Sequence, residues 1–179
     1  TNIALAFKKD PSLPSLIKEL VIMGGAITVP GNKNRVAEFN FFIDPEAANV
    51  VFESQVKKVL IPLDLCMKIP LYLKDFQKLK GSKLYPVIYN MMKDYIEKTL
   101  EFENVKGAIM FDPLAAYYIL NPKAYKLKKM DIRIETKGEL TRGMSVAERR
   151  TWGENNLNVL AAIDVKRNQF VSDFLKLLK

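Results

Sequence analysis

Two short runs of apolar residues constrain most strongly what this chain can fold into. Leu20–Met23 is followed at once by Gly24 and Gly25, and residues 59–63 form a second run that contains Pro62. Apolar runs of this length are typical of strands that are buried on both faces of a parallel sheet. Segments with helical periodicity lie between and after the two runs. This alternation predicts an α/β fold with a mainly parallel central sheet that is flanked by helices.

The rest of the chain supplies further helices and strands. Asp10 and Asp44 each precede a proline, which predicts that they cap the helices that follow them. We expect one domain over residues 1–179, because no Gly-, Ser- or Pro-rich linker divides the chain. The other expected elements are helices over residues 5–9, 12–17, 45–52, 84–100, 112–121 and 170–178, and strands over residues 126–136 and 158–165.

The composition excludes several kinds of chemistry. The chain contains no histidine and a single cysteine, Cys66. An internal disulfide, a zinc site of the usual Cys/His kind, and Ser-His-Asp or Cys-His catalysis are therefore excluded. Catalysis by this chain must use carboxylates, amides and hydroxyls, with or without a hard metal ion. The cysteine usage favours a cytoplasmic protein.

The charge balance says little about partners. Lys+Arg 28 against Asp+Glu 20 gives a formal net charge of +8, which allows an anionic partner such as RNA. The basic residues are scattered in pairs, such as Lys57-Lys58 and Arg149-Arg150, so a solvated surface is the better interpretation and nucleic-acid binding is a weak hypothesis. No apolar run approaches the ~20 residues that cross a bilayer, so we expect no membrane segment. The start at Thr1 lacks both a methionine and a secretory signal pattern, so we expect further residues upstream.

The first group of candidate functional residues follows the first apolar run. Asn32, Glu38 and Asn40 are polar, and in an extended segment Glu38 and Asn40 would share one face. A carboxylate accepts hydrogen bonds from two neighbouring hydroxyls, and an amide both donates and accepts. This set would suit a vicinal diol, such as the 2′ and 3′ hydroxyls of a ribose. The alternative is an Asx-turn at Asn32 followed by a solvated loop.

The second group consists of isolated carboxylates. Asp112 follows the apolar residues 109–111 and precedes Pro113. A carboxylate in such a stretch needs a partner or a metal ion, but a helix N-cap, with Pro113 at the first helical position, is the better interpretation of the residues alone. Asp64, at the end of the second apolar run, is either a ligand or a loop anchor. Four tyrosines could stack on a base or belong to the core: Tyr89, Tyr95, Tyr117 and Tyr118.

Taken in order, the motifs of this chain resemble those of the inosine/uridine-preferring nucleoside hydrolases, which cleave the N-glycosidic bond of ribonucleosides. The motifs run from one end of the chain to the other, and the ordered set is far more specific than any single motif. The resemblance implies the fold of that family, an α/β fold of Rossmann-like type. The matching motifs are residues 1–6, 21–26, 30–32, 37–40, 44–48, 62–64, 112–115 and 135–143.

The resemblance also implies roles for single residues. Asp112 and the backbone carbonyl of Thr1 would bind Ca²⁺. Asn32, Glu38 and Asn40 would hold the ribose hydroxyls, and Met23 would lie near the sugar. A calcium-bound water would attack the anomeric carbon, releasing ribose and the free base. The expected partners are a small-molecule nucleoside and further copies of the chain, in a dimer or a tetramer.

The chain departs from the family pattern in two places. The family begins with an aspartate-rich loop, D-x-D-x-x-x-D-D, that supplies further calcium ligands and the water-activating base. We expect this loop upstream of Thr1, so the family fold would be incomplete at the N-terminus of the chain. Phe111 occupies the position where many relatives have the histidine that protonates the leaving base, and residues 65–67 likewise replace a segment where relatives often have threonine and histidine. The alternative hypothesis is therefore a catalytically inactive relative that binds nucleosides or is structural.

Overall fold

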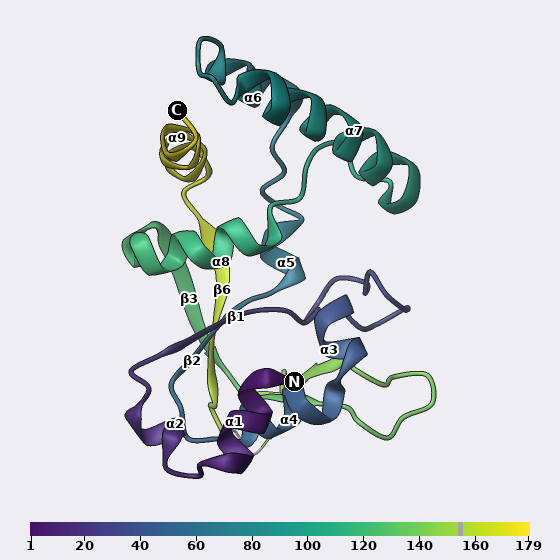
Figure 1. Ribbon diagram of the computed structural model, residues 1–179. Helices are drawn as coiled ribbons and strands as arrows, with labels where there is room; N and C mark the ends of the chain where they lie inside the picture. Colours follow the sequence, from purple (N-terminus) through teal and green to yellow (C-terminus); the bar gives the residue numbers. More distant parts are fainter. Residues whose placement is uncertain (154–155) are drawn as a thin grey trace. The chain divides into compact units, whose positions relative to one another are not determined.

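The computed structural model describes residues 1–153 and 156–179, and its contacts group them into two compact units. The first unit contains residues 1–64 and 126–163, and the second contains residues 65–125 and 164–179. The chain contains both helices and strands, and the colours of Figure 1 follow their order along the sequence. The expected α/β class is confirmed. The single domain expected from the sequence stays a prediction.

The central sheet has the strand order β1-β2-β6-β3. Strand β1 pairs in parallel with β2, and β2 pairs in parallel with β6. All four residues of β2 are buried, whereas those of β1 are half-buried. The strands are β1 (Leu20–Met23), β2 (Lys58–Ile61), β6 (Val159–Val165) and β3 (Tyr125–Met130). The expectation of a mainly parallel sheet built on the two apolar runs is therefore confirmed.

Two expected strands end earlier than their sequence patterns indicate. The run over residues 59–63 leaves the sheet at Ile61, because Pro62 has no N–H group to donate, and Leu63–Cys66 forms the short helix α5. The single strand expected over residues 126–136 is wrong, because Asp131 interrupts it and the segment forms two separate strands. Beyond the break, β4 (Ile132–Ile134) pairs in antiparallel fashion with β5 (Ser145–Ala147) in a separate sheet.

The helices of the first unit cover β1 and frame the loop that follows it. Ala4, Phe7, Ala47 and Val51 form a buried cluster against which Leu20 and Ile22 pack. The helices are α1 (Asn2–Lys9), α2 (Leu13–Leu16), α3 (Phe39–Ile43) and α4 (Pro45–Glu53).

Only one of the two expected Asp-Pro caps is present. Asp44 caps α4, because its Oδ1 accepts the N–H of Ala47 at 3.0 Å. The prediction for Asp10 is wrong: α2 begins three residues later, and Asp10 Oδ1 accepts the N–H and the hydroxyl of Ser12 at 2.9 and 2.6 Å. The carboxylate closes an Asx-turn, which competes with capping for the same acceptor.

The second unit is mainly helical. Its helices are α6 (Leu73–Phe76), α7 (Tyr85–Glu103), α8 (Phe111–Leu120) and α9 (Arg167–Leu177), with 3₁₀ turns at Gln77–Leu79 and Pro122–Ala124. Tyr117 of α8 packs on Phe170 of α9 with ring centroids 5.2 Å apart, and its hydroxyl donates to Asp173 at 2.7 Å. These contacts fix the two helices against each other. None of the helices in the described residues is long and apolar enough to span a membrane.

A buried lysine closes the end of α4. Lys58 is only 3% exposed, and its ammonium donates to the carbonyls of Ser54 and Val56 at 2.6 and 3.0 Å. Burial lowers the pKa of Lys58 from its ordinary value of 10.5, because the charged form is poorly solvated there.

Lys58→Met is expected to lower the free energy of unfolding by about 1–3 kcal/mol at neutral pH, because two carbonyls lose their donor. Between the lowered pKa and 10.5, Lys58 is protonated in the unfolded chain and largely neutral in the folded one, so its own contribution to stability rises with pH. The variant lacks this contribution, so the gap between the two proteins should widen toward pH 10.5. Urea unfolding at a series of pH values measures this difference in the free energy of unfolding. Lys57→Met, which changes a neighbouring exposed ammonium paired with Glu19, is the control; parallel pH profiles for Lys58→Met and wild type would contradict the assignment.

Candidate functional site

Glu38 is the centre of the candidate site in the first unit. It is 2% exposed and forms the N-cap of α3. Its Oε1 accepts the N–H of Asn40 at 3.0 Å, and its Oε2 accepts the N–H groups of Gly25 and Phe41 at 3.0 and 3.3 Å. The carboxylate therefore joins the start of α3 to the loop that follows β1.

The expectation that Glu38 and Asn40 share one face of an extended segment is wrong. Glu38 is extended, but the helix begins at Phe39 and Asn40 is helical. A carboxylate at the N-cap satisfies helix N–H groups that have no intrahelical partner, and this stabilises a helical turn where the spacing alone suggested a strand.

The two asparagines complete this arrangement. Asn32 Oδ1 accepts the N–H of Phe39 at 2.9 Å, and Asn40 Nδ2 lies 3.3 Å from the sulfur and 3.4 Å from the carbonyl oxygen of Met23. Both side chains are exposed. Within the described residues, Asn32 Nδ2 and Asn40 Oδ1 have no hydrogen-bond partner, so a donor and an acceptor are available to a ligand.

The structure thus brings together Met23, Asn32, Glu38 and Asn40 around the first turn of α3. The alternative of an Asx-turn at Asn32 is wrong: Asn34 makes the turn, with its Oδ1 accepting the N–H groups of Val36 and Ala37 at 2.9 and 2.6 Å.

Two glycines allow this loop to approach α3. Gly25 has a φ of +75°, and a Cβ there would lie 2.5 Å from the hydroxyl oxygen of Ser145. A Cβ at Gly31 would lie 2.2 Å from the carbonyl oxygen of Ala37. Side chains at either position would displace the segments that hold Glu38 and Asn32.

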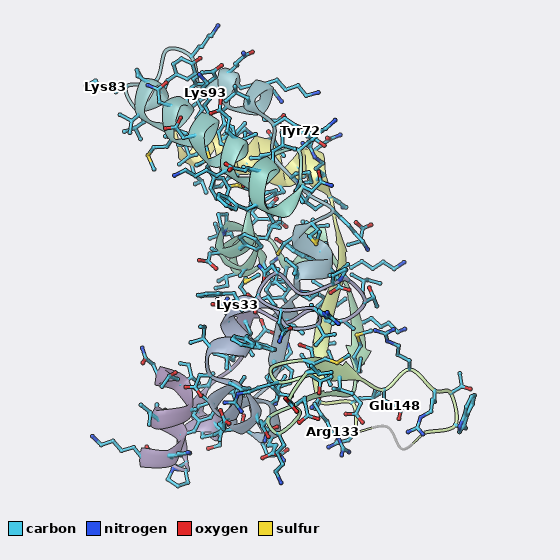
Figure 2. The ribbon with its side chains drawn as sticks, turned by 90° about the vertical axis from the view of Figure 1, so that its right-hand side faces the viewer. Lys33, Tyr72, Lys83, Lys93, Arg133 and Glu148 are labelled. Atoms are coloured by element: carbon cyan, nitrogen blue, oxygen red, sulfur yellow. The ribbon has the colours of Figure 1, made fainter. Side chains whose placement is uncertain are left out.

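An exposed aromatic ring lies beside the polar group. Phe39 is 49% exposed, and the ammonium of Lys33 lies 5.8 Å from the centroid of its ring. Figure 2 labels Lys33 on the loop that precedes α3. No pattern in the sequence assigned a role to Phe39, although it lies between Glu38 and Asn40.

Asp64 is a loop anchor. Its Oδ2 accepts the N–H of Ile27 at 2.8 Å, and its Oδ1 accepts the N–H of Thr28 at 2.7 Å and the Thr28 hydroxyl at 2.5 Å. On the other side of the same loop, the guanidinium of Arg149 donates to the carbonyl of Ile27. Of the two open alternatives for Asp64, ligand or anchor, the structure favours the anchor.

Arg142 is a second anchor, and no local pattern in the sequence predicts it. Arg142 Nη1 and Nη2 donate to the two carboxylate oxygens of Glu46 at 2.7 and 2.8 Å, and the Arg142 carbonyl lies 3.3 Å from Asn34 Nδ2. The ion pair lowers the pKa of Glu46 and raises that of Arg142. The loop over residues 135–143 is thereby tied both to α4 and to the segment that precedes α3. No spacing in the sequence connects residues so far apart.

Asp112 belongs to the second unit. Helix α8 has Met110 as its N-cap and Phe111 as its first residue, so Asp112 lies inside the first turn and the N-cap interpretation is wrong. The Asp112 side chain is exposed and has neither a hydrogen bond nor an ion pair with any residue in the described part of the chain. The start of a helix favours a negative charge.

The tyrosines divide into two pairs in the second unit. Tyr117 and Tyr118 are 4% and 5% exposed and belong to the core. Tyr89 packs on Tyr85 with ring centroids 5.3 Å apart, and the Tyr95 hydroxyl lies 3.4 Å from the carbonyl oxygen of Ile109. Tyr95 is therefore next to the segment that leads into Phe111 and Asp112.

The sequence matches the family described as "Inosine-uridine preferring nucleoside hydrolase" over residues 1–172. The chain belongs to this family. It is 32% identical over 174 residues to the pyrimidine-specific ribonucleoside hydrolase RihA of Shigella boydii serotype 4, a match that covers 96% of this chain and 56% of that protein. RihA of Escherichia fergusonii is 31% identical over 182 residues, with 100% and 58% covered.

Solved structures of nucleoside hydrolases have the same fold. The purine-preferring ribonucleoside hydrolase from Gardnerella vaginalis superposes with a TM-score of 0.87 at 28% identity, covering 98% of this chain and 56% of that one. The plant nucleoside hydrolase PpNRh1 gives a TM-score of 0.87 at 24% identity, covering 98% and 57%. The chain therefore spans 56–58% of the length of these relatives.

The two oxygen donors that the family resemblance assigns to calcium, Asp112 and the Thr1 carbonyl, are of a type that suits a hard cation. They are too few to hold it. Among the described residues, Asp112 offers a carboxylate without a partner, and the Thr1 carbonyl accepts the N–H of Leu5, at 3.0 Å. Thr1 belongs to the first unit and Asp112 to the second. No cluster of three or more metal-ligating side chains occurs within residues 1–153 and 156–179. Calcium takes about 6–8 oxygens, so the single donor that each unit offers is of a suitable kind but far from a complete ligand set.

Proposed function

We propose that the whole protein hydrolyses the N-glycosidic bond of ribonucleosides, giving ribose and a free base. The observation that carries the proposal is the group of Met23, Asn32, Glu38 and Asn40 around the start of α3, in a chain of the nucleoside hydrolase family. The relatives include a pyrimidine-specific and a purine-preferring enzyme, so the proposal leaves the base unassigned.

The residues around α3 would bind the ribose. Asn32 Nδ2 and Asn40 Oδ1 would supply a donor and an acceptor to the vicinal hydroxyls. The Glu38 carboxylate, fixed by three backbone N–H groups, would supply negative charge beside them. Met23, which touches Asn40, would contact the sugar.

Asp112 and the Thr1 carbonyl would be two of the ligands of a Ca²⁺ ion. When bound, such an ion orients a water and lowers its pKa. The water-activating aspartate would come from residues outside this chain. We also propose that the protein is cytoplasmic. We further propose that it forms a dimer or a tetramer, and size-exclusion chromatography with light scattering tests this oligomeric state.

Ribose release by the whole protein tests the proposal. We expect purified protein to release ribose from at least one of uridine, cytidine, inosine or adenosine, measured by a reducing-sugar assay. EGTA should abolish the release and excess CaCl₂ should restore it. Saturable nucleoside binding without ribose release, from protein that contains the upstream residues, would favour the inactive relative that Phe111 suggests.

Asn40→Ala is expected to lower the preference for a ribonucleoside over its 2′-deoxy analogue by at least ~10-fold. A site whose amide bonds a hydroxyl rejects analogues without it, and truncation removes that selection. Competition between the two nucleosides measures the ratio of kcat/KM values. Asn168→Ala, which removes an exposed asparagine from α9, should leave this ratio unchanged. An unchanged ratio in Asn40→Ala would remove Asn40 from the ribose site.

A further inference from the structure

The first two residues of α5, directly after β2, hold the loop that follows β1 at three points. The N–H of Leu63 donates to the carbonyl of Gly25 at 2.9 Å. The Asp64 carboxylate then accepts the N–H groups of Ile27 and Thr28, at 2.8 and 2.7 Å. Residues 25–28 are therefore fixed along one side by the β2–α5 junction.

Asp64 is the strongest of these anchors. It is 9% exposed, and its two oxygens accept three hydrogen bonds from the loop, including one from the Thr28 hydroxyl. The N–H of Ile27 belongs to a residue that is 6% exposed. Hydrogen bonds to an ionised acceptor are about twice as strong as neutral ones, and a buried N–H without an acceptor is costly.

The same loop supports Glu38 directly. Gly25 donates its N–H to Glu38 Oε2 at 3.0 Å while its carbonyl is held by Leu63. With a φ of +75°, Gly25 turns the chain so that its two peptide groups bond in different directions. Any shift of residues 25–28 therefore moves one of the three backbone donors that hold the Glu38 carboxylate.

We propose that Asp64 is a positioning residue for the ribose subsite. Through residues 25–28 it holds the Gly25 N–H against Glu38, and thereby sets the selectivity of that subsite for ribose over 2′-deoxyribose. The inference rests on the proposed function. Asp64 itself does not touch the sugar, because its carboxylate is occupied by Ile27 and Thr28.

Asp64→Asn tests the proposal in the whole protein. An asparagine keeps the shape but presents an NH₂ group to one of the two loop N–H groups. We expect the preference for a ribonucleoside over its 2′-deoxy analogue to fall ~10-fold or more, through KM rather than kcat, as for loss of a hydrogen bond to a charged acceptor. Asp131→Asn is the matched control: Asp131 is 4% exposed, lies in the same unit and accepts the N–H of Asn156 at 2.9 Å. It should leave the preference unchanged.

A double-mutant cycle with Glu38→Gln separates positioning from general loss of stability. If Asp64 acts through Glu38, Asp64→Asn should change the preference less than ~2-fold in the Glu38→Gln background. Additive effects, or wild-type preference in a folded Asp64→Asn protein, would overturn the proposal. Should Asp64→Asn fail to fold, Thr28→Val removes only the hydroxyl bond to Asp64 and should lower the preference ~2–5-fold; no change would likewise overturn it.

A second readout does not depend on activity. Amide exchange of Gly25, followed by NMR on the whole protein, should accelerate ~10-fold or more in Asp64→Asn and stay unchanged in Asp131→Asn. If the whole protein released no ribose, the proposed function would fail. The exchange measurement would still show whether Asp64 holds the Gly25 N–H in place. Unchanged exchange at Gly25 would overturn the positioning role even in an active enzyme.

Discussion

Replacing Asp112 with asparagine is expected to abolish calcium-dependent ribose release by the whole protein while leaving its fold intact. Loss of a supporting partner of a metal ligand already costs about 10–100-fold, so loss of a carboxylate ligand should lower kcat/KM at least ~100-fold. Stability should change little, because the Asp112 side chain is exposed and has no partner among the described residues. Only its interaction with the start of α8 is lost, about 0.3–1 kcal/mol.

Three measurements check this prediction. Ribose release should fall, calcium affinity measured by calorimetry should weaken, and the thermal midpoint should stay within a few degrees of wild type. Asp94→Asn, which neutralises an exposed carboxylate of α7 in the same unit, should change none of them. Full activity and calcium affinity in Asp112→Asn would show that Asp112 is not a ligand.

Phe111→His is expected to raise the rate on ordinary nucleosides relative to nitrophenyl riboside by about 10²–10⁴-fold, the usual contribution of general acid catalysis. Phe111 is the first residue of α8, directly before Asp112, and a phenyl ring cannot protonate a departing base. Wild type should therefore favour substrates whose leaving group needs no proton. A histidine at this position supplies a group with a pKa of about 6.5.

The ratio of the two rates, measured with calcium present, checks the prediction. Phe102→His is the control, because it adds a histidine at a 77% exposed position of α7. An unchanged ratio in Phe111→His would mean that another group already protonates the base. Tyr95→Phe then becomes the next variant, since the Tyr95 hydroxyl lies 3.4 Å from the carbonyl oxygen of Ile109.

The sheet could be predicted from the sequence because its strands carry a local signal. Leu20–Met23 is a strand at the predicted residues, whereas β2 begins one residue before its predicted run and ends at Ile61, before Pro62. The residues at which helices begin were harder to predict from the sequence. Asp10 and Asp44 have the same Asp-Pro pattern, but Asp10 bonds Ser12 and forms a turn, and this choice depends on packing beyond the dipeptide.

The candidate site was predictable in its members but not in its geometry. The family motifs place Asn32, Glu38 and Asn40 together, and the structure does bring them together. That Glu38 caps α3 and bonds Gly25 could not be deduced, because neither contact follows from residue spacing. The choice between ligand and anchor for Asp64 likewise depended on its contacts with Ile27 and Thr28, which lie 37 and 36 positions before it in the sequence.

The three backbone N–H groups around Glu38 have a consequence for how tightly this subsite can bind. A glutamate that becomes ordered only when a ligand arrives loses about 1.5–2 kcal/mol of rotamer entropy at that moment. Glu38 has already lost this freedom when the chain folds, so a sugar that uses the carboxylate is spared the cost. Affinity is thereby linked to local folding: loosening the first turn of α3 should weaken binding before the rest of the unit unfolds.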